Sequence, residues 1–93
     1  MNIQHEISEN KGRFYYEIEN KQMAEMTYSN AGPDKIIIDH TEVDPSLKGQ
    51  GVGYALVHAA VEFAREKNVK ILPLCPFAAA VFKKKSDYND VLF

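Results

Sequence analysis

The sequence predicts a mixed α/β fold in which an antiparallel N-terminal meander is followed by a strand, a helix, a strand and a helix. Polar and apolar residues alternate over the first thirty positions, which is typical of strands with one covered face. Three consecutive isoleucines in Lys35–Val43 indicate a further strand, and from Val52 onward apolar residues recur with a helical period. Because 93 residues suffice for one domain and not for two, we expect a single domain over residues 1–93.

The meander is predicted to contain three strands separated by turns. Their alternating patterns run over residues 3–8, 13–19 and 23–28. Asn10-Lys11-Gly12 and Asn20-Lys21 supply the turn chemistry between these strands. The isoleucine-rich strand comes next, and its uninterrupted β-branched run predicts a central strand covered on both faces.

The C-terminal half is predicted to alternate between helix and strand. The helical stripe ends at Asn68, a plausible helix stop, and the short apolar strand Val69–Leu74 follows. Pro73 cannot donate a ladder hydrogen bond, so this strand must be unpaired or splayed there. Pro76 suits the first turn of a second helix, and Tyr88–Phe93 forms either a last strand or an apolar clamp. The strand–helix–strand unit predicts a parallel crossover.

Charge is distributed unevenly along a chain whose net charge is −2. Residues 1–47 carry four basic and nine acidic residues, whereas residues 48–93 carry seven basic and four acidic residues. The whole molecule therefore gives no case for nucleic-acid binding. The C-terminal half could attract a small polyanion, and the alternative is chance clustering on a solvated surface.

The cellular compartment is predicted from the single cysteine and the absence of apolar runs. Cys75 cannot form a disulfide within the chain, so a reducing compartment is the simpler interpretation. No segment approaches the ~18 consecutive apolar residues of a membrane span. Residues 1–10 alternate polar and apolar and resemble neither a signal nor a transit peptide. We therefore expect a cytoplasmic protein that does not bind membranes.

The segment Lys48–Gly53, with the sequence Lys-Gly-Gln-Gly-Val-Gly, follows a strand and opens a helix. Glycines let the backbone turn tightly and let a ligand approach it closely. The first N–H groups of a helix have no acceptor within it, and the helix dipole adds positive potential there. These features predict an anion site that fits a pyrophosphate. A glycine-rich helix start without a ligand is the alternative.

Two familiar phosphate-binding loops do not fit these glycines. The Rossmann fingerprint needs three glycines at wider spacing, with a carboxylate about 20 residues further on. The P-loop needs Gly-Lys-Ser/Thr, whereas Gly53 is followed by Tyr54 and Ala55.

The segment resembles the coenzyme A signature of the GNAT acetyltransferases, Arg/Gln-x-x-Gly-x-Gly/Ala, with Lys48 where that family usually has Arg or Gln. The isoleucine-rich strand before it, the helix after it and the segment Ile71–Phe77 resemble a minimal, single-domain branch of that family. The resemblance covers residues 35–92 well and the meander only by pattern. It implies a GNAT-like fold with diverging central strands, between which the pantetheine arm enters and pairs with the first.

The resemblance also implies the ligands of the protein. Acetyl-coenzyme A is the implied cofactor and small-molecule acyl donor, and an unidentified amine is the implied acceptor. The residues implied for cofactor binding are Val43, Lys48, Gly49, Gln50, Gly51, Val52, Gly53, Tyr54, Cys75 and Pro76.

Cys75 is the first candidate for chemistry. It precedes Pro76 at a predicted helix N-terminus, a position that favours the thiolate form of a cysteine. It could accept the acyl group or stabilise the leaving thiol. The alternative is a buried cysteine that packs as a small apolar residue.

Glu42 and His40 are the second candidates, two residues apart on one face of the end of a strand. Acetyl transfer needs a neutral amine, so a base must remove its proton. Glu42 is the base implied by the resemblance, and histidine has a suitable ordinary pKa near 6.5. Two ordinary polar positions are the alternative. His5 and His58 are expected to be structural, and no cluster has metal-ligand spacing.

The chain departs from larger members of the family at the second predicted helix. Many of them carry a tyrosine general acid there, whereas this helix has none. Tyr88 or Cys75 could take that role. Lys83, Lys84 and Lys85 could bind the 3′-phosphate of coenzyme A, although a solvated helix end is the simpler interpretation.

The sequence leaves two alternatives to an N-acetyltransferase. One is a module that binds acyl-coenzyme A without turnover, because so short a chain has little left to build a substrate pocket. The other is an adapter whose loop no longer binds a ligand. The sequence does not define the acceptor or the oligomeric state.

Overall fold

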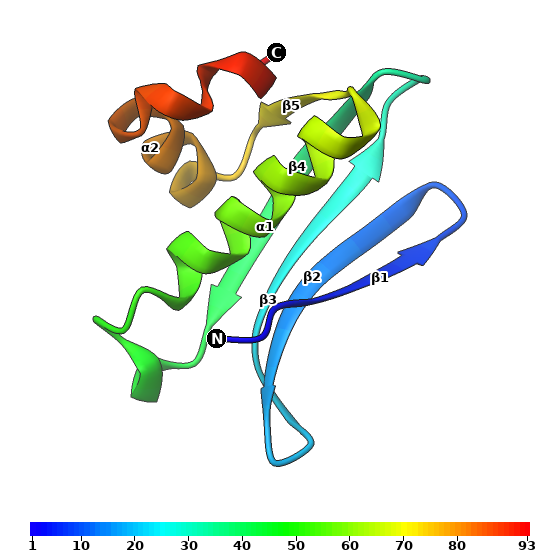
Figure 1. Cartoon of the computed structure of the whole chain (residues 1–93). Helices are drawn as coiled ribbons and strands as arrows, with labels where there is room; N and C mark the ends of the chain where they lie inside the picture. The colour runs from blue at the N-terminus through cyan, green and yellow to red at the C-terminus, as the bar shows by residue number, and fades with distance from the viewer.

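The computed structural model describes residues 1–93 and contains one five-stranded sheet in the order β1-β2-β3-β4-β5. The strands are β1 (Gln4–Ser8), β2 (Lys11–Ile18), β3 (Lys21–Asn30), β4 (Lys35–Val43) and β5 (Lys70–Pro73). The helices are α1 (Val52–Lys67) and α2 (Pro76–Lys84), with short 3₁₀ helices η1 (Pro45–Leu47) and η2 (Ser86–Val91). Figure 1 shows this arrangement, and the predicted mixed α/β fold is confirmed.

Strand pairing follows the predicted order. β1 to β4 pair antiparallel, each with the next along the chain, and β4 pairs parallel with β5 through the crossover helix α1. The crossover helix begins at Val52, and Asn68 ends it in the left-handed conformation with φ 58° and ψ 45°. The N–H of Asn68 donates to the carbonyls of Ala64 and Arg65, so the predicted helix stop is confirmed.

Both helices lie against one face of the sheet (Figure 1). We call this the covered face; it carries the buried side chains of Phe14, Met26 and Ile38. The opposite face, which carries Arg13, Thr27 and Ile37, is the open face. The prediction that β4 is covered on both faces is wrong, because no helix lies against the open face and Ile37 is only half-buried between Ile36 and Ile38.

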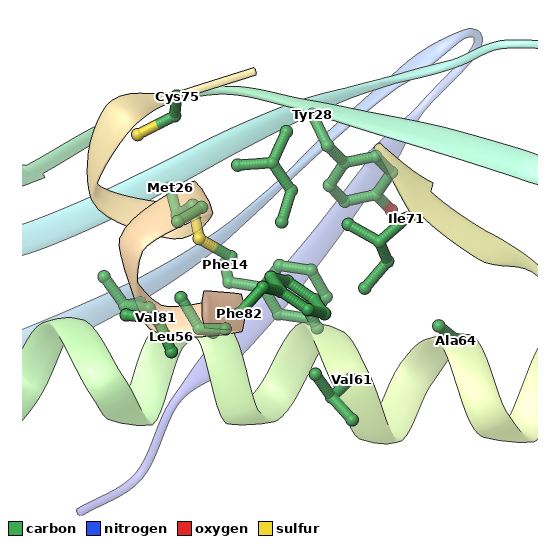
Figure 2. Packing of buried hydrophobic residues seen from close by; sticks show 14 of the residues in the cluster. Phe14, Met26, Tyr28, Leu56, Val61, Ala64, Ile71, Cys75, Val81 and Phe82 are labelled. Atoms are coloured by element: carbon green, nitrogen blue, oxygen red, sulfur yellow. The ribbon is translucent and has the colours of Figure 1, made fainter. Parts of the chain in front are cut away.

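The core lies between the covered face and the helices. Figure 2 shows Leu56, Val61 and Ala64 of α1 beneath side chains of the sheet and of α2. Twenty apolar residues form this cluster, and no polar or charged residue is buried in it. Burial of each large aliphatic or aromatic side chain contributes about 1.5–3 kcal/mol, so the sheet is stabilised from this side alone.

The C-terminal segment was predicted as a strand or an apolar clamp, and it is chiefly a clamp. η2 buries Tyr88 and Val91, and strand-like pairing is confined to one parallel bridge between Ile71 and Leu92. The N–H of Phe93 donates to the carbonyl of Ile71 at 2.9 Å. Neither α1 nor α2 has the length and apolar character that a membrane crossing requires.

Candidate functional site

The loop before α1 turns through two glycines in the left-handed region. Gly49 has φ +82° and Gly51 has φ +77°, values that other residues adopt only with strain. A Cβ built on either glycine would meet no atom within 4 Å, so both face open space. The loop therefore leaves its backbone accessible to a ligand.

The first turn of α1 presents free hydrogen-bond donors next to these glycines. The first helical bond runs from Ala55 N to Gly51 O at 3.0 Å. The N–H groups of Gly51, Val52, Gly53 and Tyr54 have no acceptor in the protein. No acidic side chain lies in this turn, so the positive end of the helix dipole is not neutralised locally. The arrangement suits an anion.

Gly53 serves a different purpose from the other two glycines. A Cβ at this position would lie 2.5 Å from Cζ of Phe77, so Gly53 allows α2 to approach α1 closely. Phe77 is partly exposed and lines a hollow of about 370 Å³ at the loop, together with Val43, Gly51 and Tyr54. Its ring also packs edge-on against Tyr54, with centroids 5.9 Å apart. Sequence reasoning missed Phe77, because its place depends on how the two helices pack.

The three lysines at the end of α2 differ in their surroundings. Nζ of Lys85 lies 5.8 Å from the ring centroid of Tyr54, which is in the first turn of α1. Lys83 and Lys84 form no ion pair and no cation–π contact. Lys85 is thus the lysine that adds positive charge beside the loop.

β4 and β5 separate after four residue pairs. Pairing ends where Ile38 lies opposite Pro73, and the N–H groups of Leu74 and Cys75 then both donate to the carbonyl of Ile38 at 3.0 and 3.1 Å. The remainder of β4, Asp39–Val43, has no partner on that side, and we call it the unpaired edge of β4. The predicted divergence of the central strands at the proline is confirmed.

The backbone of Val43 points into this opening. Asp44 N donates to Met23 O at 2.8 Å, so Asp44 is hydrogen-bonded to β3. Successive residues of an antiparallel strand alternate in direction, so the N–H and C=O of Val43 point away from β3. Val43 also lines the hollow at the glycine loop, which connects the unpaired edge to the free donors of α1.

A β-bulge sets the faces on which the polar residues of β4 lie. The register shifts between Thr27 and Tyr28, so that Tyr28 pairs with Ile38 and Thr27 with His40. Beyond the bulge, Thr41 lies opposite Met26 on the covered face, whereas His40 lies on the open face. Both base candidates of β4, His40 and Glu42, therefore lie on the open face, whereas Thr41 between them lies on the covered face.

Cys75 lies on the covered side, at the N-cap of α2, and is 4% exposed. Its thiol does not cap the helix; instead it donates to Oγ1 of Thr41, with Sγ and Oγ1 3.2 Å apart. Pro76 occupies the first turn of α2, as predicted. Sequence reasoning missed Thr41, because nothing local in the sequence indicates that a bulge turns it toward Cys75.

His40 and Glu42 lie on the open face at the unpaired edge. Their side chains are 64% and 76% exposed, and Nε2 of His40 is 4.0 Å from Oε2 of Glu42. Glu42 lies opposite Glu25, whose carboxylate is paired with Arg13 at 3.1 Å. The two base candidates are thus adjacent, and both can meet a molecule that approaches from solvent.

The remaining histidines bond to tyrosine hydroxyls. Nε2 of His5 is 2.6 Å from the hydroxyl of Tyr28, and Nδ1 of His58 is 2.9 Å from the hydroxyl of Tyr88. Burial lowers the pKa of His5 and raises the pKa values of Tyr28 and Tyr88. The hydroxyl of Tyr88 is thus hydrogen-bonded to His58 of α1, and no hydrogen bond joins it to Cys75.

The match to a known family covers the loop, the unpaired edge and the cysteine. A family model described as GCN5-related N-acetyl-transferase matches residues 13–91. The chain belongs to this family. It is 44% identical to a GCN5-like protein of Staphylococcus aureus whose solution structure has been determined. The match covers 99% of this chain and 89% of that one, with a TM-score of 0.75.

More distant members of this GCN5-related fold are longer than the chain. The ribosomal-protein-S18-alanine N-acetyltransferase of Escherichia coli is 19% identical with a TM-score of 0.70, and the match covers 84% of this chain and 53% of that one. A Clostridium acetobutylicum acetyltransferase solved with acetyl-CoA is 21% identical with a TM-score of 0.67, with 82% and 56% covered. At these identities the likeness establishes the fold alone. No curated protein matches the chain.

Proposed function

We propose that this member of the GCN5-related family is an N-acetyltransferase that binds acetyl-coenzyme A between the glycine loop and the unpaired edge of β4. The observation that carries the proposal is the set of four free N–H groups from Gly51 to Tyr54, beside two glycines that face open space. Donors at a helix N-terminus bind a diphosphate through hydrogen bonds and the helix dipole together.

The remaining parts of the cofactor have matching partners. The N–H and C=O of Val43 are free to pair with an amide of the pantetheine arm, as one strand pairs with another. Phe77 and Tyr54 offer apolar surface at the hollow. Lys85 supplies a charge for the 3′-phosphate. Lys48, at the loop, carries no ion pair that would compete with a phosphate.

The open face supplies the proton acceptor. When bound, acetyl-coenzyme A supplies an acetyl group activated as a thioester. An amine that reaches the unpaired edge from solvent meets Glu42 and His40 first, because both side chains are exposed there. One of them takes the ammonium proton, which frees the nitrogen lone pair for attack.

The covered face supplies a thiol. Cys75 is held by Thr41 at the start of α2, where no acidic residue lies in the first turn. Two roles suit it: it accepts the acetyl group before the amine does, or it protonates the departing thiolate of the cofactor. The two roles differ in whether an acetylated protein accumulates.

Binding is tested by titrating the isotope-labelled protein with coenzyme A. We expect the amide resonances of Gly49–Tyr54 and Thr41–Val43 to shift, whereas those of the Glu19–Asn20 turn stay in place. Wild-type protein should bind coenzyme A lacking the 3′-phosphate more weakly than intact coenzyme A. Lys85→Ala should bind the two compounds with equal affinity. If the loop resonances do not move at saturating coenzyme A, the proposal is wrong.

Turnover separates an enzyme from a module that only binds. Acetyl-coenzyme A is incubated with the protein and a panel of amines, and thiol release is followed. Release above the uncatalysed rate supports the transferase, and binding without release indicates a sensor. Mass spectrometry of wild type and Cys75→Ala then tests the covalent role: an added acetyl mass on the wild type alone assigns it to Cys75.

A further inference from the structure

Two successive residues of β4, Asp39 and His40, lie on the same face of the sheet. Side chains of a regular strand alternate between faces, so this arrangement requires an extra residue. Tyr28 pairs with Ile38 and Thr27 pairs with His40, which leaves Asp39 without a partner on β3. Asp39 is therefore the bulged residue.

The bulge changes the face of every later residue in β4. Ile36 and Ile38 are buried on the covered face before it, and Thr41 and Val43 are the partly buried residues after it. In a regular ladder, Met26 would lie opposite His40 instead of Thr41. The imidazole would then point at the core, and Thr41 would leave Cys75.

The carboxylate of Asp39 spans the bulge. One oxygen accepts a hydrogen bond from the hydroxyl of Thr27, and the other accepts from the hydroxyl of Ser29 at 3.2 Å. Thr27 and Ser29 flank Tyr28, whose partner immediately precedes Asp39. One side chain thus ties the extra residue of β4 to β3 at the two open-face positions beside the shift.

We infer that Asp39 is a positioning residue that fixes the register of β4, and so holds Thr41 against Cys75 while His40 and Glu42 face solvent. Its carboxylate has both oxygens bonded within the sheet, so it acts through these residues and does not itself take up the amine proton. The catalytic consequence rests on the proposed acetyl transfer, whereas the effect on register does not.

The register is read directly from backbone contacts. The Met23–Asp44 pair is hydrogen-bonded, so Met26–Thr41 is a non-hydrogen-bonded pair, in which Cα atoms approach to about 4.5 Å. Such pairs give an Hα–Hα nuclear Overhauser contact. We expect the wild type to show the Met26–Thr41 contact, and Asp39→Ala to lose it or to replace it with Met26–His40.

Three variants make the test specific. Asp39→Asn keeps an acceptor oxygen and should retain the Met26–Thr41 contact. The double variant Thr27→Val with Ser29→Ala removes both donors and should reproduce Asp39→Ala, and it decides the matter if Asp39→Ala does not fold. Asp34→Ala removes an equal charge from the turn before β4, where its carboxylate has no hydrogen-bond partner, and should change nothing.

A second set of measurements records the reactivity of the Cys75 thiol and the rate of acetyl transfer. Loss of register should expose Cys75 to alkylation by iodoacetamide and lower kcat on the order of 100-fold, because small displacements of reacting groups have effects of that size. Affinity for coenzyme A should fall far less than kcat, since the donors on α1 are untouched and only the pairing at Val43 is lost. An unchanged Met26–Thr41 contact in folded Asp39→Ala would overturn the inference, whatever the activity. Absence of acetyl transfer in the wild type would overturn only the proposed function.

Discussion

The covered and open faces of the sheet differ most at the end of β4, where one short segment contributes to both. On the covered face, the thiol of Cys75 donates a hydrogen bond to Thr41 at the margin of an otherwise apolar core. On the open face, His40 and Glu42 are exposed to solvent. A strand whose partner ends early can therefore hold a thiol of α2 on one side, through Thr41, and present proton acceptors on the other. The bulge at Asp39 is what assigns these residues to their faces.

The largest effect on activity is expected on the open face. Glu42→Gln or His40→Gln, whichever removes the base, should lower kcat by roughly 10²–10⁴-fold, the usual contribution of a general base. Affinity for coenzyme A and thermal stability should not change, because both side chains are exposed. Steady-state kinetics and calorimetry measure these quantities. Glu66→Gln, which neutralises an exposed carboxylate on α1, is the control, and full activity in both variants would mean that the open face holds no base.

Substitution of two neighbouring isoleucines tests how much each face of the sheet contributes to the stability of the fold. Ile38 is fully buried against the helices, so Ile38→Ala should destabilise the fold by about 2–5 kcal/mol through lost burial and a cavity. Ile37 lies on the open face and is half-buried, so Ile37→Ala should destabilise it by about 1 kcal/mol. Urea unfolding measures both. Equal losses would contradict the description of a sheet stabilised from one side.

Alanine substitutions at two glycines distinguish the effect of backbone strain from an effect on ligand binding. Gly51 and Gly32 both have positive φ and both face open space, so alanine at either should destabilise the fold by about 1–2 kcal/mol. Only Gly51→Ala puts a methyl group beside the free donors of α1. We expect it to weaken coenzyme A binding on the order of tenfold, the equivalent of about 1.4 kcal/mol, and Gly32→Ala to leave binding unchanged. Calorimetric titration decides, and equal affinities in the two variants would argue against diphosphate binding at the loop.

Elements that depend on nearby residues were predictable from the sequence. The meander follows from period-two alternation and turn residues, and the start of α1 at Val52 follows from its apolar stripe. The glycine loop belongs to the same class, since its conformation and free donors arise within six consecutive residues. Pro73 likewise marked the point where β5 separates from β4, because the missing N–H is a local property.

Features that depend on pairing between distant segments were not predictable. The alternation of residues along β4 gives no sign of the bulge, which is defined only by the register with β3. Thr41 could therefore not be assigned to the face of Cys75. Phe77 was missed for a similar reason, because it covers Gly53 only when α1 and α2 lie on the same side of the sheet. The same placement of both helices leaves the open face of β4 uncovered, so the prediction of a strand covered on both faces was wrong.

The smallest expected effect concerns a titratable ring on the covered face. His5 stacks on Phe14 with ring centroids 4.1 Å apart and meets the edge of Phe63 at 4.6 Å. Burial lowers the pKa of His5, so the unfolded chain binds a proton more readily than the folded protein does. Folding stability should therefore fall as the pH decreases below about 6.5, the ordinary value for histidine.

Substitution isolates this contribution to the pH dependence of stability. His5→Phe keeps an aromatic ring in the cluster and removes the titration, so its stability should vary less than that of the wild type between pH 7.5 and pH 5.5. Tyr28→Phe removes the hydroxyl 2.6 Å from the imidazole but leaves His5 packed against Phe14, and should retain the dependence. Thermal unfolding of the three proteins at both pH values measures it. If His5→Phe and wild type lose equal stability on acidification, the pH response does not come from His5.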